Sequence, residues 1–261
     1  MAQLEFDENL VQSMEVLYNR RDVLRRRRLV HSALDVQPGE RLLDVGCGPG
    51  FYVTELLDRV GPRGRVTGID TASAMLAVAA KRSEGHPNAT FRQAGAAEIP
   101  AEDGEFDAVL SVQVLEYVPD VTSALAEIHR VLRPGGRVVI WDVDWSTVSW
   151  RSNDADRMRR MLAAWDKHLT HAALPQGLSN LLRENGFENI TMDAHAFASI
   201  ELTPEAYGGA LVDIIADYAV KQGGVDLAEA RAWKSEQREL NAAGEFYFAC
   251  VQCCFVARKP D

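Results

Sequence analysis

The sequence contains no apolar run long enough to cross a membrane, and no N-terminal segment in which basic residues precede an apolar stretch. It has only four cysteines, Cys47, Cys250, Cys253 and Cys254, which do not form a disulfide framework. We therefore expect a cytoplasmic protein in a reducing compartment. No histidine or second cysteine pair is placed to complete a tetrahedral site, so we expect no metal. Internal repeats and low-complexity tracts are also lacking.

Basic residues are scarce: 28 Lys and Arg against 38 Asp and Glu give the 261-residue chain a formal net charge of −10. A protein whose main partner is nucleic acid needs a basic surface to neutralise phosphates, so this charge argues against such a partner. The hydrophobic fraction of 47% and the charged fraction of 25% are ordinary for a globular chain. The length allows one large domain with a substantial core.

The stretch around which the chain is organised is 41–50, Arg-Leu-Leu-Asp-Val-Gly-Cys-Gly-Pro-Gly. Leu42, Leu43 and Val45 form an apolar run without polar alternation, which predicts a strand buried on both faces. The glycines let the backbone turn tightly and approach a ligand, and a helical pattern resumes from Phe51. Strand, glycine turn and helix form the first unit of a doubly wound sheet, whose ligand lies beyond the carboxyl ends of the strands.

The glycine spacing restricts the ligand. Gly46, Gly48 and Gly50 give G-x-G-x-G, whereas a dinucleotide fingerprint is G-x-G-x-x-G. No Lys-Ser/Thr pair follows, which excludes a phosphate-binding P-loop. An acidic residue, Asp44, precedes the turn.

Residues 42–50 resemble the first motif of class I S-adenosylmethionine (SAM)-dependent methyltransferases. Residues 68–76, 111–120 and 132–136 also resemble motifs of this family, within a match that covers about 38–142. The resemblance is to the group that includes ubiquinone/menaquinone C-methyltransferases and many small-molecule methyltransferases. It implies an α/β, Rossmann-like doubly wound sheet of seven strands in the order 3-2-1-4-5-7-6, with strand 7 antiparallel. SAM would be the cofactor and S-adenosylhomocysteine (SAH) the product.

By this resemblance the glycine turn faces the methionine part of SAM and Asp44 helps to hold its amino group. Asp70 ends the strand predicted at 65–70, where a carboxylate can accept both ribose hydroxyls. The alternative for Asp70 is a cap for the helix that follows. The cofactor contacts predicted from the resemblance are Asp44, Gly46, Cys47, Gly48, Gly50, Asp70, Thr71, Met75, Gly95, Ala96, Ala97 and Gln113.

Gly95 departs from the family pattern, which usually places an Asp there to recognise the adenine amino group. Backbone groups near Ala96 and Ala97 are the alternative source of that contact. Met75 is expected to pack on the adenine ring, and Gln113 follows the strand predicted at 106–112, where the ligand crevice lies.

The whole chain is interpreted as one domain, with an N-terminal helical arm at 1–36 and cap insertions at 142–175 and 203–243. The fifth strand is expected at 137–142, and the last two strands at 187–202 and 245–256.

The segment 141–150 contains three tryptophans and two aspartates at an active-site location. An aromatic, acidic wall suits a cationic or aromatic substrate, although Trp141 itself is expected to pack in the core. Trp145 is a candidate substrate contact, with packing as the alternative. Tyr117, where relatives often carry His, is a second candidate.

Displacement at an activated sulfonium needs mainly alignment and desolvation, so the lack of a catalytic triad does not argue against an enzyme. A base is required only if the acceptor must lose a proton. The candidates are Tyr18, Asp144, His168 and His171. For Tyr18 we favour packing, and for the histidines a surface or helix-end position.

The predicted arm also carries six arginines between residues 20 and 28. They form either an anion-binding face or a solvated helix face, and we favour the second.

We therefore expect an enzyme that transfers a methyl group from SAM to an N, O or C nucleophile of a small molecule, with no nucleic acid and no membrane span. The alternatives are an RNA methyltransferase, suggested only by the arginines, and a non-catalytic SAM-binding regulator, suggested by Gly95. A nicotinamide-dependent dehydrogenase would require the other glycine spacing.

Overall fold

The computed structural model describes residues 18–261, and it contains one mixed sheet of seven strands. The strand order is β3-β2-β1-β4-β5-β7-β6, and β7 runs antiparallel to both of its neighbours. This confirms the expected topology. The strands are β1 (Arg41–Val45), β2 (Arg65–Asp70), β3 (Ala89–Gln93), β4 (Phe106–Val112), β5 (Leu132–Trp150), β6 (Glu188–Ser199) and β7 (Phe248–Arg258).

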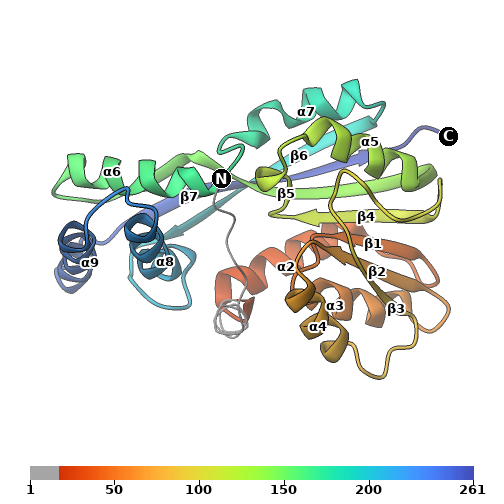
Figure 1. Cartoon of the computed structure of the whole chain (residues 1–261), viewed down its shortest axis with the longest axis horizontal. Helices are drawn as coiled ribbons and strands as arrows, with labels where there is room; N and C mark the ends of the chain where they lie inside the picture. Colours follow the sequence, from red (N-terminus) through yellow and green to blue (C-terminus); the bar gives the residue numbers. More distant parts are fainter. Residues whose placement is uncertain (1–17) are drawn as a thin grey trace.

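Helices cover both faces of the sheet, with α2, α3 and α4 on one side and α5 and α7 on the other (Figure 1). Adjacent residues of β1 separate the two cores: Leu42 packs with Leu56 of α3, and Leu43 packs with Leu125 of α5. This explains the unbroken apolar run, because a parallel strand covered on both faces has no polar side. The helices of these layers are α2 (Arg21–Leu34), α3 (Phe51–Val60), α4 (Ser73–Arg82), α5 (Val121–Val131) and α7 (Leu174–Glu184), with the 3₁₀ turn η1 (Leu115–Tyr117) after β4.

The fifth strand is much longer than expected. It was predicted to end at Asp142, but it continues to Trp150 because β7 pairs with it along this length, for example Asp142 with Cys253 and Trp150 with Phe248. It also begins earlier, at Leu132, with a register shift before Arg137. Trp141 is fully buried and donates a hydrogen bond from Nε1 to Oε1 of Gln252 (2.8 Å), which confirms its expected packing role.

Three helices gather around the extended ends of β5 and β7, away from the other layers (Figure 1). They are α6 (Ala155–Trp165), α8 (Tyr207–Lys221) and α9 (Leu227–Ala242), and the 3₁₀ turn η2 (Asp166–His168) follows α6. The sequence pattern of residues 154–171 predicts a single helix, but α6 ends earlier, at Trp165. No helix among residues 18–261 is both long and apolar enough to span a membrane.

Thr203-Pro204-Glu205 has the sequence pattern of a helix start, with an N-cap, a proline in the first turn and an acid, but α8 begins at Tyr207. Its first residue, Tyr207, donates its backbone N–H to Oδ2 of Asp22 on α2 (2.8 Å). A carboxylate at a helix N-terminus satisfies an otherwise unpaired donor and favours the helix dipole. The cap of α8 therefore comes from a distant element, which a local sequence pattern does not reveal.

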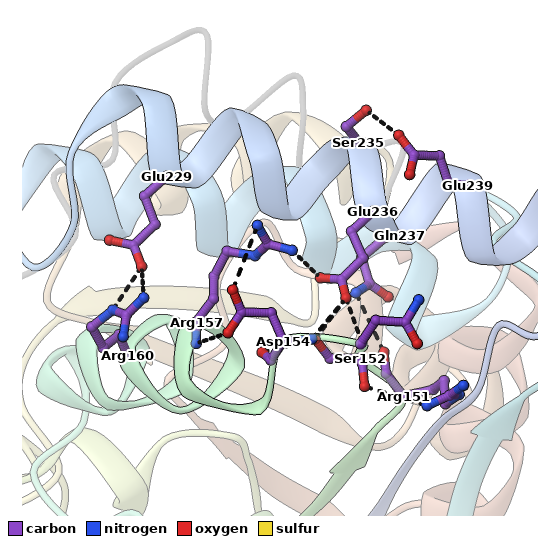
Figure 2. Close-up of polar contacts among 11 residues, drawn as sticks. Arg151, Ser152, Asp154, Arg157, Arg160, Glu229, Ser235, Glu236, Gln237 and Glu239 are labelled. Carbon is purple, nitrogen blue, oxygen red and sulfur yellow. Dashed lines mark hydrogen bonds and ion pairs between the residues drawn. The ribbon is translucent and has the colours of Figure 1, made fainter.

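Glu236 joins α9 to the start of α6 (Figure 2). Its Oε1 accepts hydrogen bonds from the Ser152 hydroxyl (2.9 Å) and the Asp154 N–H (3.2 Å), and its Oε2 accepts one from Arg157 (2.8 Å). A second ion pair joins Arg160 to Glu229. These contacts hold α6 and α9 together as one unit.

We predict that Glu236→Ala lowers the free energy of unfolding by about 3 kcal/mol, because it leaves the half-buried Arg157 without its closest carboxylate and removes an acceptor of the Ser152 hydroxyl and the Asp154 N–H. Glu239→Ala, which removes an exposed contact with Ser235 on the same helix, is the matched control and should change it by less than about 0.5 kcal/mol. Urea denaturation of both variants measures the difference. Equal effects would contradict this role for Glu236.

Candidate functional site

The turn between β1 and α3 is built on glycines that no other residue replaces easily. Gly46, Gly48 and Gly50 have φ values of +68°, +50° and +79°, in the left-handed region. A Cβ on Gly46 would lie 2.3 Å from a methyl of Val114, and one on Gly50 would lie 2.7 Å from the Cβ of Ala79. At Gly46 and Gly50, backbone conformation and packing both require glycine.

Gly48 is the open position of the turn, because the nearest atom to an added Cβ is the hydroxyl of Tyr18 at 3.7 Å. The Tyr18 ring stacks on Phe51, with centroids 5.1 Å apart and an interplanar angle of 5°. Tyr18 therefore lies over the glycine turn. Its proposed part in catalysis stays a prediction.

Two carboxyls flank this turn. Asp44 is 2% exposed and its Oδ2 has no hydrogen-bond partner. Burial, and then the neighbouring Asp70, raise the pKa of Asp44 well above its ordinary value. Asp70 accepts hydrogen bonds from the N–H groups of Gly48 and Ala72, each at 2.9 Å. Asp70 thus connects the end of β2 to the turn, and its side chain does not cap α4.

The predicted adenine pocket follows the ends of β2 and β3. Met75 and Ala96 are buried, while Thr71 and Ala97 are exposed. A Cβ on Gly95 would meet only the methyl of Thr71, at 3.9 Å. The space that an aspartate would fill at this position is therefore open. Cys47, also among the predicted contacts, is buried, and its sulfur packs against Gly68.

Gln113 marks the end of β4 and adopts a left-handed conformation with φ of 54°. Its N–H donates to the carbonyl of Trp141 (2.7 Å), which holds it beside β5. Its side chain accepts a hydrogen bond from Arg26 of α2 and donates one to the hydroxyl of Tyr207 on α8 (3.3 Å). Gln113 therefore links the helical arm to the helices beyond the sheet.

Arg26 is a site residue that the sequence analysis missed. It is 4% exposed, and its Nε has no hydrogen-bond partner. The hydroxyls of Tyr18 and Tyr52 lie near both Arg26 and Asp44: burial raises their pKa most, Arg26 lowers it and Asp44 raises it. An arginine and a carboxyl therefore lie near the same two hydroxyls.

The favoured interpretation of the arginine cluster was wrong for Arg26 and Arg27, which are buried, although Arg21, Arg25 and Arg28 are exposed. Arg27 forms an ion pair with Glu55 (3.2 Å). The helical spacing of these arginines with apolar residues in the sequence could have indicated that they are buried. The buried stripe of α2 contains Val23, Arg26, Arg27, Val30 and Leu34.

A second buried acidic pair was also missed. Glu116 in η1 and Asp142 in β5 are fully buried. Burial raises the pKa of Glu116 to about 7, although a hydrogen bond from Nε1 of Trp145 (3.1 Å) opposes the shift. Burial and then Glu116 raise the pKa of Asp142 well above its ordinary value. Arg26 lowers the pKa of both groups and so lies near them.

The predicted substrate contacts, Tyr117 and Trp145, lie beside this pair. His168 connects them, with its ring centroid 5.8 Å from each. Burial lowers the pKa of His168 to about 4, so this ring is neutral at pH 7. It also packs on Trp165, whose carbonyl contacts its Nδ1.

The remaining base candidates have local partners. Nε2 of His171 contacts the Val118 carbonyl (3.0 Å). Asp144 accepts hydrogen bonds from the hydroxyl of Ser146 (2.5 Å) and from the amide of Gln176 (3.0 Å). Their catalytic roles stay predictions.

Comparison with known proteins gives a family match over residues 43–140, to the model described as "Methyltransferase domain". An uncharacterised 37.1 kDa protein of a Streptomyces fradiae transposon is 32% identical over 87% of this chain and 64% of its own length. A demethylmenaquinone methyltransferase of Staphylococcus epidermidis is 38% identical over 47% of this chain and 51% of its own length. The chain thus spans between half and two thirds of these relatives.

Among solved structures, the phosphoethanolamine N-methyltransferase 2 of Haemonchus contortus, in complex with S-adenosyl-L-methionine, superimposes with a TM-score of 0.66. The alignment covers 99% of this chain and 58% of the other, at 19% identity. At that identity the likeness establishes the fold.

We predict that Asp44→Asn stabilises the unliganded protein at pH 8 by on the order of 2 kcal/mol, because it removes a buried carboxyl that lacks a partner. The pKa of Asp44 is higher in the folded than in the unfolded chain. The Asp44 carboxyl therefore destabilises the folded state increasingly as the pH rises above the pKa that Asp44 has in the unfolded chain. The gain should therefore shrink towards pH 4. Urea denaturation across this range measures it, and a gain that grows towards low pH would contradict the assignment.

Proposed function

We propose that this chain, which matches the methyltransferase domain family over residues 43–140, transfers the methyl group of SAM to a small-molecule acceptor. The observation that carries the proposal is the set of unpaired polar atoms around the glycine turn. They belong to Asp44 and Arg26, which both lie near the Tyr18 and Tyr52 hydroxyls. Buried polar groups without partners in a native structure require an explanation, and a ligand supplies one.

Each chemical group of the cofactor has a suitable partner among the residues of the site. Asp44 suits the α-ammonium of the methionine part, and Arg26 suits its α-carboxylate. Asp70 would exchange its backbone contacts for the ribose hydroxyls. Met75 and Ala96 would line the adenine, and the open space at Gly95 indicates that backbone groups, rather than a side chain, recognise its amino group.

When bound, SAM supplies a methyl group activated by a sulfonium charge, which an acceptor nucleophile displaces. The chain's own residues would orient the reactants and exclude water. Gln113 is placed for this, because it holds Arg26 of the arm and Tyr207 of α8 together above the end of β4.

We propose that the segments 142–175 and 203–243 act as a cap over the acceptor, although residues 142–150 belong to β5. The support is that α6, α8 and α9 pack as one unit and that Tyr207 of α8 reaches Gln113.

A capped site suits a small molecule. The names of the S. epidermidis and H. contortus proteins also refer to small-molecule acceptors. The net charge of −10 disfavours an RNA substrate.

We predict that Asp70→Ala weakens binding of SAH and of 5′-methylthioadenosine alike, by about 100-fold, because both ligands carry the ribose. Isothermal titration measures both affinities, and circular dichroism checks the fold. Wild-type affinity in this variant would remove Asp70 from the site.

Unlike Asp70→Ala, the variants Asp44→Asn and Arg26→Met should weaken the binding of only one of these two ligands. 5′-Methylthioadenosine lacks the amino acid group, so we expect both variants to bind it as the wild type does, while SAH affinity falls about 10- to 100-fold. Arg27→Met, which changes the neighbouring buried arginine, is the control and should retain SAH affinity. A parallel loss of both ligands would contradict the pairing of these charges with the amino acid group.

A further inference from the structure

The carboxyls of Glu116 and Asp142 are not among the groups proposed above to hold the cofactor. Glu116 lies in the turn directly after β4, three residues beyond Gln113, and Asp142 lies on β5. Oε2 of Glu116 accepts the hydrogen bond from Trp145, while its Oε1 has no partner. Neither oxygen of Asp142 has a side-chain partner. A fully buried carboxyl with an unpaired oxygen can accept a hydrogen bond from a ligand.

The charge balance indicates the sign of that ligand. Arg26 is the cation that faces both carboxyls. If Arg26 pairs with the cofactor's carboxylate, as proposed above, Glu116 and Asp142 lose this compensation. Because a buried carboxylate without a counter-charge is strongly unfavourable, the site then favours a cation.

The rings beside Glu116 suit the same ligand. Trp145 donates to Glu116, Tyr117 follows it in the chain, and His168 packs against both rings. Part of Tyr117 is exposed, although burial raises the pKa of its hydroxyl, which lies near Glu116. Aromatic faces attract ammonium groups, and an adjacent carboxylate strengthens the preference.

We propose that the acceptor is a primary or secondary amine that binds as its ammonium, and that Glu116 is the catalytic residue that takes its proton. This rests on the proposed methyl transfer. An N–H bond of the ammonium breaks as an O–H bond forms on Glu116, and the electron pair stays on nitrogen. Nitrogen then forms the bond to the methyl carbon, while the pair of the C–S bond goes to sulfur.

The pKa of about 7 suits this exchange at neutral pH. The ionisable groups that face Glu116 come from five elements: Arg26 of α2, Tyr117 of η1, Asp142 of β5, Tyr207 of α8 and Cys250 of β7. Among these, Arg26 favours the charged carboxylate and Asp142 disfavours it.

Binding to the SAH complex tests the proposal without turnover. The probes are benzylamine, phenethylamine and ethanolamine, each compared with the neutral molecule that has a hydroxyl or hydrogen in place of the amine. At pH 6.5, we expect at least one amine to bind more than 10-fold tighter than its neutral counterpart. Proton release should accompany binding, because the ammonium shifts Glu116 to its ionised form. Titration in two buffers of different ionisation enthalpy measures this release.

Glu116→Gln keeps an acceptor for Trp145 and should retain SAH affinity, but it should lose the amine preference and the proton release. Asp144→Asn is the matched comparison, since Asp144 is a buried β5 carboxyl with its own partners. Absence of amine binding, or unchanged amine binding in Glu116→Gln, would overturn the proposal. If Glu116→Gln fails to fold, Glu116→Asp replaces it, with reduced amine affinity expected.

With an amine that is methylated, kcat/KM should rise with pH to an inflection near 7. In Glu116→Gln it should fall about 100-fold and lose this rise. If the rise of kcat/KM with pH is lost in Asp144→Asn and kept in Glu116→Gln, Asp144 and not Glu116 is the group that takes the proton. Turnover of neutral acceptors alone, with normal SAH binding, would overturn the amine assignment and leave the methyl transfer standing. Failure to bind SAH would refute the proposed function itself.

Discussion

The dominant constraint in this protein is the burial of charge where β1 and β4 end, beside the middle of β5. Asp44, Glu116, Asp142 and Arg26 all lie there out of contact with solvent. Removing ionised groups from water is costly unless each obtains a partner, and in the unliganded chain several of their atoms have none. We therefore expect ligands of complementary charge to stabilise the site, whose unliganded form carries a stability cost that the fold must offset.

The scaffold offsets this cost by covering the site from several directions. The buried stripe of α2 carries Arg26 into the core together with Val23 and Val30. Asp22, on the same helix, receives the first N–H of α8, and Gln113 connects Arg26 to Tyr207. Helix α2, the sheet and α8 thus meet through a few polar contacts, so we expect ligand binding to affect all three together.

The sequence predicted the parts of this structure that depend on local pattern. The apolar run and glycine turn identified β1 and its connection to α3, and the resemblance to the methyltransferase family implied the topology of the sheet. It did not predict contacts between distant segments. The extension of β5 depends on pairing with β7, the start of α8 depends on Asp22, and the burial of Arg26 depends on the packing of α2. Glu116 was overlooked because a charged residue in a loop is ordinarily exposed.

The central claim is that the buried charges at this edge bind the amino acid group of SAM, and the most direct measurement is isothermal titration of the unmodified chain. SAH, 5′-methylthioadenosine and NAD are compared in the same buffer. We expect SAH to bind in the micromolar range, more tightly than 5′-methylthioadenosine, and NAD not to bind. Binding of NAD alone would contradict the cofactor assignment. Equal affinity for SAH and 5′-methylthioadenosine would show that the buried charges serve another purpose.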